Sequence, residues 1–221
     1  MVRTSTILPA TRRTALIASS TTDRRLRKLV AENVRLTREL KELKRLRRWA
    51  RQDSLTGLPN RRLFEERLEE ELSRSERDPS QQGAILVVDV NELKWVKEQF
   101  GQAVGDAALQ ETARVLRGTL RAADLCCRTG GDEFMILLPE TSAAGARQAM
   151  ARLRVSVIRS GARQDIPLSI SVGMSSWPAD GQLVSDLLYS ADLAMEAEKR
   201  RIAAQGRRRP PRAPRPLALV R

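Results

Sequence analysis

Two glycines followed by two acids form the centre of the stretch Arg128-Thr-Gly-Gly-Asp-Glu-Phe134. Short apolar runs flank it, which predicts a β-hairpin with a tight turn, and Gly130 and Gly131 can supply the positive φ angles that such a turn needs. Asp132 and Glu133 then lie at the edge of a strand, where adjacent carboxylates suit a hard cation such as Mg²⁺. Taken alone, Gly-Gly-Asp-Glu is more often an ordinary hairpin with two solvated acids.

A further acid, Asp89, lies near the end of the apolar run from Ala84 to Val90. An aspartate at the end of a buried strand is unfavourable unless it binds something. Asp89 and Asp132 are therefore candidates to converge on one metal ion.

With both stretches in view, the chain resembles the GGDEF-domain family of bacterial diguanylate cyclases. The resemblance runs from Asp53-Ser-Leu-Thr-Gly-Leu-Pro-Asn-Arg-Arg62 to about Lys199. It implies an α/β fold with a nucleotide-cyclase-like, mainly antiparallel central sheet flanked by helices. It also implies condensation of two GTP molecules to cyclic di-GMP and two pyrophosphates, by two domains that face each other in a homodimer with Mg²⁺ (or Mn²⁺) as cofactor.

The resemblance assigns roles to individual residues. Asp89 and Asp132, with the carbonyl of Val90, match the metal ligands, and Glu133 is the next acid of the catalytic group. The positions that match substrate contacts are Lys94, Lys97, Asp106, Gly130, Gly131 and Lys199. Taken singly, the lysines also fit a solvated helix face, and Asp106 also fits an acid favoured by the dipole at a helix N-terminus.

Several positions depart from the family pattern. Lys97 stands where a guanine-reading asparagine is usual, and lysine can only donate hydrogen bonds. Ala203 stands where an arginine contacts phosphate, although Arg200 lies one helical turn earlier. Further departures are Asn91, Gln102, Glu196 and Glu198. We therefore expect an intact metal site and weakened recognition of the nucleotide.

Arg121-Ala-Ala-Asp124 precedes Gly130 by five intervening residues. This spacing resembles the family's inhibitory RxxD site, which implies that Arg121 and Asp124 bind the product. An arginine fork suits phosphate or a guanine edge, and aspartate accepts from guanine. The alternative is an exposed ion pair at a helix end.

Charge is unevenly distributed along the 221 residues, whose formal net charge is +13. Residues 1–52 carry 15 basic and 4 acidic side chains, and residues 200–221 carry 8 basic and no acidic ones. Such ends attract polyanions or a membrane surface nonspecifically, although they more often serve solubility. No apolar run approaches the roughly 20 residues that span a bilayer, and no signal peptide is evident. We expect a cytoplasmic protein in which Cys126 and Cys127 pack as reduced thiols.

Four parts are expected along the chain: a disordered N-terminus (1–22), a coiled-coil dimerisation helix (23–52), a GGDEF domain (53–204) and a basic tail rich in proline and arginine (205–221). In the helix, heptad positions a and d hold mostly leucine: Leu26, Asn33, Leu40 and Arg47 at a, and Leu29, Leu36, Leu43 and Ala50 at d. One asparagine at an a position favours a parallel dimer in one register. The alternative is a lone amphipathic helix packed on the domain.

Strands are expected at residues 84–90, in a hairpin over 124–138, and at 168–172, where the alternating pattern ends at Gly173. Helices are expected up to Arg77 and over 92–99, 106–120, 143–159 and 183–204, with a break at Gly101 and Gly105.

Two functions of different classes remain open. The retained acids favour an active cyclase, whereas Lys97 and Ala203 favour a catalytically weak or inactive receptor that binds cyclic di-GMP through Arg121 and Asp124. Nucleic-acid binding by the basic ends has no base-reading motif behind it. The expected input is a regulatory protein partner, the tails or the expression level.

Overall fold

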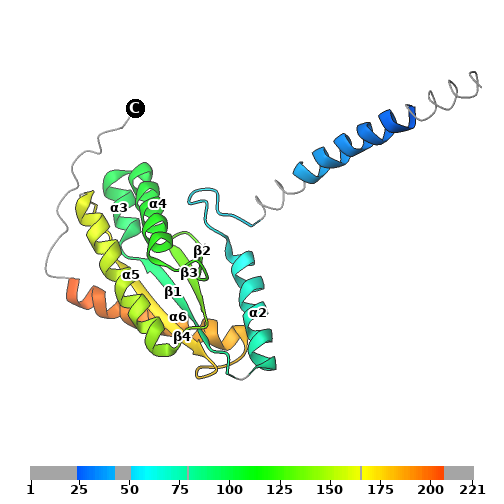
Figure 1. Cartoon of the computed structure of the whole chain (residues 1–221). Coiled ribbons are helices and arrows are strands. Elements are labelled where there is room, and N and C mark those ends of the chain that lie inside the picture. Colours follow the sequence, from blue (N-terminus) through cyan, green and yellow to red (C-terminus); the bar gives the residue numbers. More distant parts are fainter. Residues whose placement is uncertain (1–23, 43–50, 79, 165, 207–221) are drawn as a thin grey trace, which may run out of the picture. The chain divides into compact units, whose positions relative to one another are not determined.

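The computed structural model describes residues 24–42, 51–78, 80–164 and 166–206, and the chain separates into two units at residue 50 (Figure 1). The described part of the first unit is one helix over residues 24–42. Its apolar side chains are all more than half exposed: Leu26, Leu29, Val30, Val34, Leu36 and Leu40. The predicted heptad positions Leu43, Arg47 and Ala50 lie outside the described residues, as do most of the two basic ends.

The second unit interleaves helices and strands along the chain (Figure 1). Its elements are α2 (Arg61–Arg77), β1 (Gly83–Val90), α3 (Leu93–Phe100), α4 (Gln102–Thr119), β2 (Leu125–Arg128), β3 (Glu133–Pro139), α5 (Ala143–Arg163), β4 (Ile170–Trp177) and α6 (Val184–Gly206). No described helix is both long and apolar enough to cross a bilayer.

The four strands form one sheet in the order β2-β3-β1-β4, and every neighbouring pair is antiparallel. Its central strand β1 is buried along its whole length, as its apolar sequence predicts. The expected α/β fold with an antiparallel sheet flanked by helices is confirmed.

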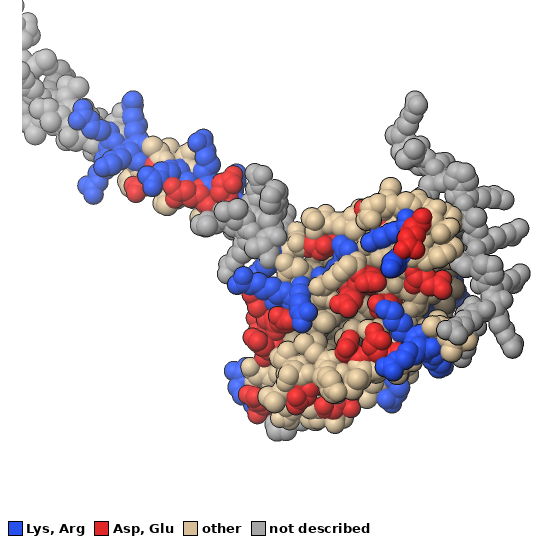
Figure 2. Space-filling model, turned by 180° about the vertical axis from the view of Figure 1, so that it is seen from behind, with Lys and Arg blue, Asp and Glu red and all other residues tan. Residues whose placement is uncertain are grey.

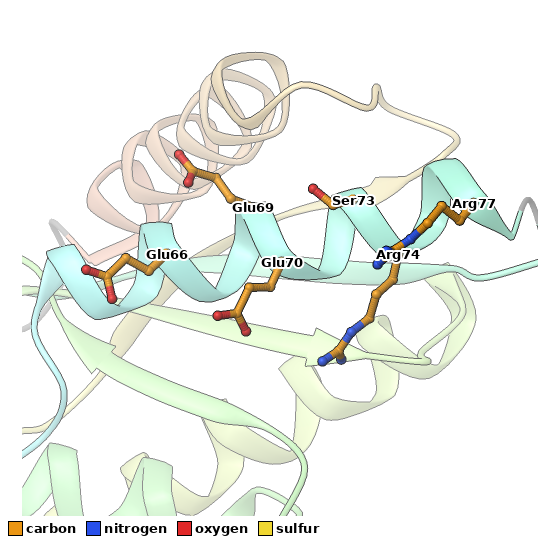
Figure 3. Close-up of a pocket in the computed structure, with 6 residues that line it drawn as sticks. All are labelled: Glu66, Glu69, Glu70, Ser73, Arg74 and Arg77. Atoms are coloured by element: carbon orange, nitrogen blue, oxygen red, sulfur yellow. The ribbon is translucent and has the colours of Figure 1, made fainter.

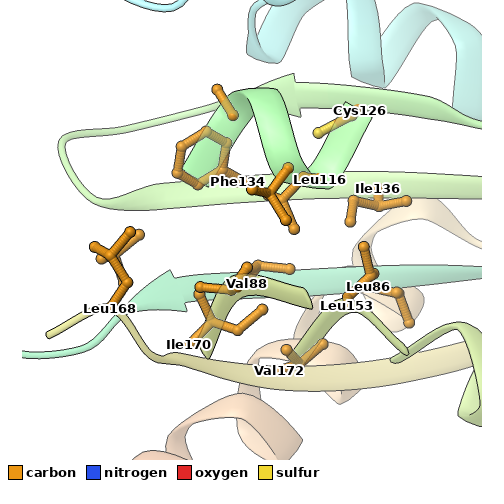
Figure 4. Packing of buried hydrophobic residues seen from close by; sticks show 14 of the residues in the cluster. Leu86, Val88, Leu116, Cys126, Phe134, Ile136, Leu153, Leu168, Ile170 and Val172 are labelled. Atoms are coloured by element: carbon orange, nitrogen blue, oxygen red, sulfur yellow. The ribbon is translucent and has the colours of Figure 1, made fainter. Parts of the chain in front are cut away.

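Alternate residues of β1 face opposite sides of the sheet, because successive side chains of a strand point in opposite directions. Leu86 and Val88 pack into a core with α4 and α5 (Figure 4). Ile85 and Val87 pack into a second core with α2 and α6. Asp89 continues the second series, so its side chain is placed on the side of the sheet that α6 covers.

The cysteines follow the same alternation. Cys126 belongs to the core on the α4 and α5 side and Cys127 to the core on the α2 and α6 side. Both are free and buried, and burial raises the pKa of Cys127 to about 12. Their predicted role as packing residues is confirmed.

The boundary between α3 and α4 differs from the prediction. The break occurs at Gly101 alone, where φ is 87°, and α4 begins at Gln102. Gly105 lies inside α4, and a Cβ atom there would clash with the side chain of Lys97 on α3. The glycine thus marks a close approach of two helices, which a local sequence signal does not distinguish from a break.

The last strand also differs. β4 begins at Ile170, two residues after the predicted start, and continues through Gly173 to Trp177. A Cβ atom on Gly173 would clash with the carbonyl of Ala191 in α6. Gly173 therefore allows α6 to pack directly on the strand and does not end it.

The hairpin forms where predicted, but its turn was predicted wrongly. Four residues, 129–132, connect β2 to β3, and Thr129 N donates to Glu133 O at 3.0 Å. Neither Gly130 nor Gly131 adopts a positive φ angle. Loops of this length are mostly built on turns with negative φ angles, whereas two-residue turns require positive ones.

Glu111 of α4 forms a buried polar contact with α5. Its carboxylate accepts hydrogen bonds from Ser160 Oγ and from Arg114 Nε, the latter at 2.8 Å. Burial alone would raise the pKa of Glu111, but the hydrogen bond from Arg114 has the larger effect and lowers this pKa to about 2.

Replacing Glu111 by glutamine is expected to reduce the free energy of unfolding by about 2 kcal/mol near neutral pH, because charge-assisted hydrogen bonds are lost. A lowered folded-state pKa stabilises the protein above the ordinary value of 4.5, and this contribution is lost as the pH falls toward about 2. Urea unfolding at about pH 7 and about pH 3.5 should therefore show a smaller difference between Glu111→Gln and wild type at the lower pH. Glu69→Gln, on the exposed face of α2, is the matched control. A difference independent of pH would contradict the ion pair.

Candidate active site

Strand pairing brings the predicted acids together. Asp89 on β1 lies opposite Glu133 on β3 in the antiparallel register. Val90 N donates to the carbonyl of Asp132 at 3.0 Å. The acids of two stretches more than 40 residues apart in the sequence therefore meet at one end of the sheet.

Asp89 is the most enclosed of these acids, with only 3% of its surface exposed. Its Oδ2 accepts a hydrogen bond from Lys199 Nζ at 2.7 Å, whereas its Oδ1 is buried without a partner among the described residues. Burial raises the pKa of Asp89, and this effect is larger than the lowering of the pKa by the ion pair with Lys199. The negative charges of Asp132 and Glu133 raise the pKa further. The buried oxygen makes this a place where a cation would be stabilised.

A cavity of about 330 Å³ lies beside Asp132. Residues of α3 and of the hairpin loop line it: Leu93, Lys94, Lys97, Glu98, Gly131 and Asp132. Lys94 is 90% exposed, with Glu98 as a distant partner at 3.9 Å. The loop before α3 contains Glu92 at a φ of 57°, a backbone conformation that non-glycine residues rarely adopt and that occurs often at functional sites. Lys94, Lys97 and Asp132, which the sequence predicted as site residues, therefore line the same cavity.

Gly130 and Asp106 are not among the residues that line this cavity. Gly130 lines a separate depression together with Asp53, Arg128 and Gly131. Asp106 accepts a hydrogen bond from Gln102 Nε2 at 2.8 Å. Because α4 begins at Gln102, Asp106 lies beyond the first turn, and the alternative of an acid placed by the helix dipole is wrong.

Arg128 has a structural role that the sequence did not reveal. Its Nη1 bonds both carboxylate oxygens of Asp53 at 3.0 Å, and its Nη2 donates to the carbonyl of Gly131 at 2.7 Å. Arg128 therefore connects the segment that enters the domain to the loop that carries Asp132. Both residues stand in stretches that the sequence had singled out, but 75 positions separate them.

A larger depression runs along α2 and contains none of the predicted residues (Figure 3). Its lining is Glu66, Glu69, Glu70, Ser73, Arg74 and Arg77. Figure 2 shows acidic and basic side chains interspersed over one face of the second unit. The α2 depression fits a solvated helix face with i,i+3 and i,i+4 ion pairs.

The family described as "Diguanylate cyclase, GGDEF domain" matches residues 50–205, which is more than half of the chain. The chain belongs to the GGDEF-domain family. This confirms the resemblance inferred from the acids and glycines.

Curated proteins with similar sequences include proteins of Pseudomonas aeruginosa and Caulobacter vibrioides. The diguanylate cyclase TpbB of P. aeruginosa UCBPP-PA14 is 39% identical over 167 residues, which cover 72% of this chain and 37% of TpbB. MucR of P. aeruginosa, a bifunctional diguanylate cyclase/cyclic di-GMP phosphodiesterase, is 36% identical over 76% of this chain and 24% of its own length. PleD of C. vibrioides, a response regulator, is 34% identical over 63% of this chain and 32% of PleD. The chain thus spans well under half the length of these relatives.

Solved structures of related proteins share the fold. The GGDEF domain of TpbB from P. aeruginosa superposes with a TM-score of 0.63 at 36% identity, covering 68% of this chain and 89% of that chain. The diguanylate cyclase SiaD of P. aeruginosa, in complex with its activator SiaC, has a TM-score of 0.63 at 33% identity, covering 86% of this chain and 75% of the SiaD chain. The coiled coil and GGDEF domain of DgcB from Caulobacter crescentus has a TM-score of 0.70 at 23% identity, covering 81% of this chain and 95% of that chain, which shows likeness of fold alone.

In this GGDEF domain, Arg121 and Asp124 lie at the end of β2 remote from the Gly-Gly loop. Arg121 Nη2 bonds Asp124 Oδ1 at 3.1 Å and Thr141 Oγ1 at 2.6 Å. Asp124 is only 1% exposed at its side chain, whereas Arg121 is 56% exposed. A cavity of about 300 Å³, which Arg117 also lines, adjoins the pair.

The carboxylates of Asp89 and Asp132 suit a divalent cation whose remaining ligands come from a substrate. Within the described residues, no three acidic or cysteine side chains are already arranged as a metal cage. Asp89 nevertheless has a buried oxygen without a partner, and Asp132 lies beside it. Mg²⁺ is commonly bound by one or two carboxylates together with substrate phosphates, and this donor set agrees with that preference.

Proposed function

We propose that this chain is a diguanylate cyclase that condenses two GTP molecules to cyclic di-GMP and two pyrophosphates. The observation that carries the proposal is the meeting of Asp89 and Asp132 at one sheet end, with an unpartnered buried oxygen on Asp89. The cavity next to Asp132, which Lys94 and Lys97 line, would receive the triphosphate. Relatives named as diguanylate cyclases at up to 39% identity support the same activity.

The reaction forms a bond between the 3′-oxygen of one GTP and the α-phosphorus of the other, breaks the α–β phosphoanhydride bond, and releases pyrophosphate and the proton of the attacking hydroxyl. Asp89, Asp132 and the carbonyl of Val90 would hold Mg²⁺ (or Mn²⁺). When bound, this ion neutralises triphosphate charge and lowers the pKa of the attacking hydroxyl. Glu133 would position the ion or the nucleophile.

The remaining groups bind and orient the nucleotide. Lys94 and Lys199 would donate to phosphate oxygens, and Gly130 and Gly131 allow the substrate to approach the loop backbone. Asp106 would accept from the N1 and N2 edge of guanine. Lys97 cannot accept from the guanine amino group, so the loss of one such hydrogen bond would weaken binding by about 1 kcal/mol.

Each domain would hold one GTP, so turnover requires two copies of the chain. The exposed leucines of the helix over residues 24–42 support a homodimer joined through a coiled coil.

A turnover assay tests the activity. Purified protein, freed of bound nucleotide, is incubated with GTP and MgCl₂, and the products are identified by mass spectrometry. We expect cyclic di-GMP from wild type and none from Asp132→Ala. No product from folded, dimeric wild type would refute the cyclase.

The second candidate function is a receptor for cyclic di-GMP that has little or no catalytic activity. The cavity beside Arg121 and Asp124, together with the departures at Lys97 and Ala203, favours it. A folded protein that binds cyclic di-GMP but forms none from GTP would support the receptor.

Replacing Arg121 by alanine is expected to weaken binding of cyclic di-GMP at least about tenfold, because a charged contact to the ligand is lost. The same change should relieve product inhibition. Calorimetric titration measures the affinity, and progress curves measure the inhibition. Arg152→Ala, which removes an exposed arginine of α5, is the matched control. An affinity equal to that of wild type would exclude this site.

A further inference from the structure

Lys199 connects α6 to the acids at the end of the sheet. Its Nζ lies 2.7 Å from Asp89 Oδ2, across 110 positions of sequence. The side chain of Asp89 is 4% exposed, whereas that of Lys199 is 41% exposed. The aspartate is therefore fixed inside the protein, and the lysine reaches it from a position open to solvent.

Further carboxylates lie near this pair. Asp132 interacts electrostatically with both Asp89 and Lys199, and Glu133 acts on Asp89 and Glu196 on Lys199. No ion pair of Asp132 or Glu133 with a basic side chain is found within the described part of the chain. A group of carboxylates in a partly buried place needs a positive charge nearby, and the ammonium of Lys199 supplies one.

We propose that Lys199 is an exchangeable counter-cation: it neutralises Asp89 when no metal is bound, and a metal ion that binds Asp89 displaces it. This inference rests on the proposed function for the presence of the metal. It adds that the metal and the ammonium compete for one carboxylate.

The exchange has a consequence for substrate binding. An ammonium released from Asp89 is free to donate to phosphate oxygens beside the same site. The metal alone would bind weakly because it must break the ion pair. The metal and a triphosphate would bind cooperatively, because the triphosphate accepts the displaced ammonium.

Mn²⁺ alone, without nucleotide, tests the competition directly. Free Mn²⁺ is measured by electron paramagnetic resonance at about pH 8, where carboxylates are ionised. We expect Lys199→Met to bind Mn²⁺ roughly tenfold more tightly than wild type, because the competing charge is gone. Arg201→Met removes a neighbouring exposed charge that pairs with Glu198 and does not contact Asp89, and it should stay within about twofold of wild type. Affinity in Lys199→Met that is unchanged or weaker would overturn the proposal.

A second measurement uses the wild-type protein, so it does not depend on whether the Lys199→Met variant folds. The ¹⁵Nζ and ¹³Cε signals of Lys199 are followed by NMR as MgCl₂ is added without nucleotide. A shift that saturates with metal binding is expected, and signals that stay unchanged while metal binds would overturn the exchange. Both readouts are independent of turnover, so a missing cyclase activity would refute the proposed function and leave this test intact.

Discussion

The Asp89→Asn variant is expected to synthesise cyclic di-GMP at least about 10³-fold more slowly than wild type. A neutral amide binds a metal ion much more weakly than a carboxylate does, so the ion would not be held beside the triphosphate. Asparagine has nearly the same shape as aspartate, so the packing at the end of β1 should persist. It also removes a buried charge, which limits the effect on the free energy of unfolding. Lys199 loses its partner but is already 41% exposed and remains hydrated.

Initial rates with GTP and MgCl₂, measured together with thermal unfolding, separate a chemical effect from a structural one. Asp192→Asn is the matched control, because Asp192 is an exposed residue of α6 with no described ion pair. It should turn over within about twofold of wild type. If Asp89→Asn retained more than about a tenth of the wild-type rate while folded, Asp89 would not be a metal ligand of the reaction.

The Leu36→Glu variant is expected to be monomeric and to lose turnover almost completely. Leu36 is a d position near the middle of the described helix and is 52% exposed in the single chain. A parallel coiled coil would bury it against the same residue of the partner, where two glutamates would repel each other and lose apolar burial. Because each domain would hold one of the two GTP molecules, loss of the dimer would remove the second substrate.

Val34→Glu provides a closely matched control. Val34 is 53% exposed, almost the same as Leu36, but it occupies heptad position b, which faces away from a coiled-coil seam. Light scattering should give a dimer for wild type and Val34→Glu and a monomer for Leu36→Glu. If both variants had the wild-type mass, the helix would not be the dimerisation element. If both were monomeric, the helix would associate through a face other than the predicted one.

The sequence predicted the elements of the GGDEF domain because their signals are local. The unbroken apolar run before Asp89 specifies a buried central strand, and the hairpin follows from two apolar runs around Gly130 and Gly131. The errors occurred at glycines. Gly105 and Gly173 were interpreted as ends of elements, although they lie inside a helix and a strand where neighbouring elements pack closely.

By itself, the sequence singled out the candidate acids and glycines and predicted the elements on which they lie, because the family's motifs are short and continuous. Tertiary structure alone decided how they are partnered. The side of the sheet that α6 covers sets Lys199 against Asp89, and the packing of the entry segment sets Asp53 against Arg128. These contacts join residues 110 and 75 positions apart. They depend on strand order and helix packing, which no local pattern of residues specifies.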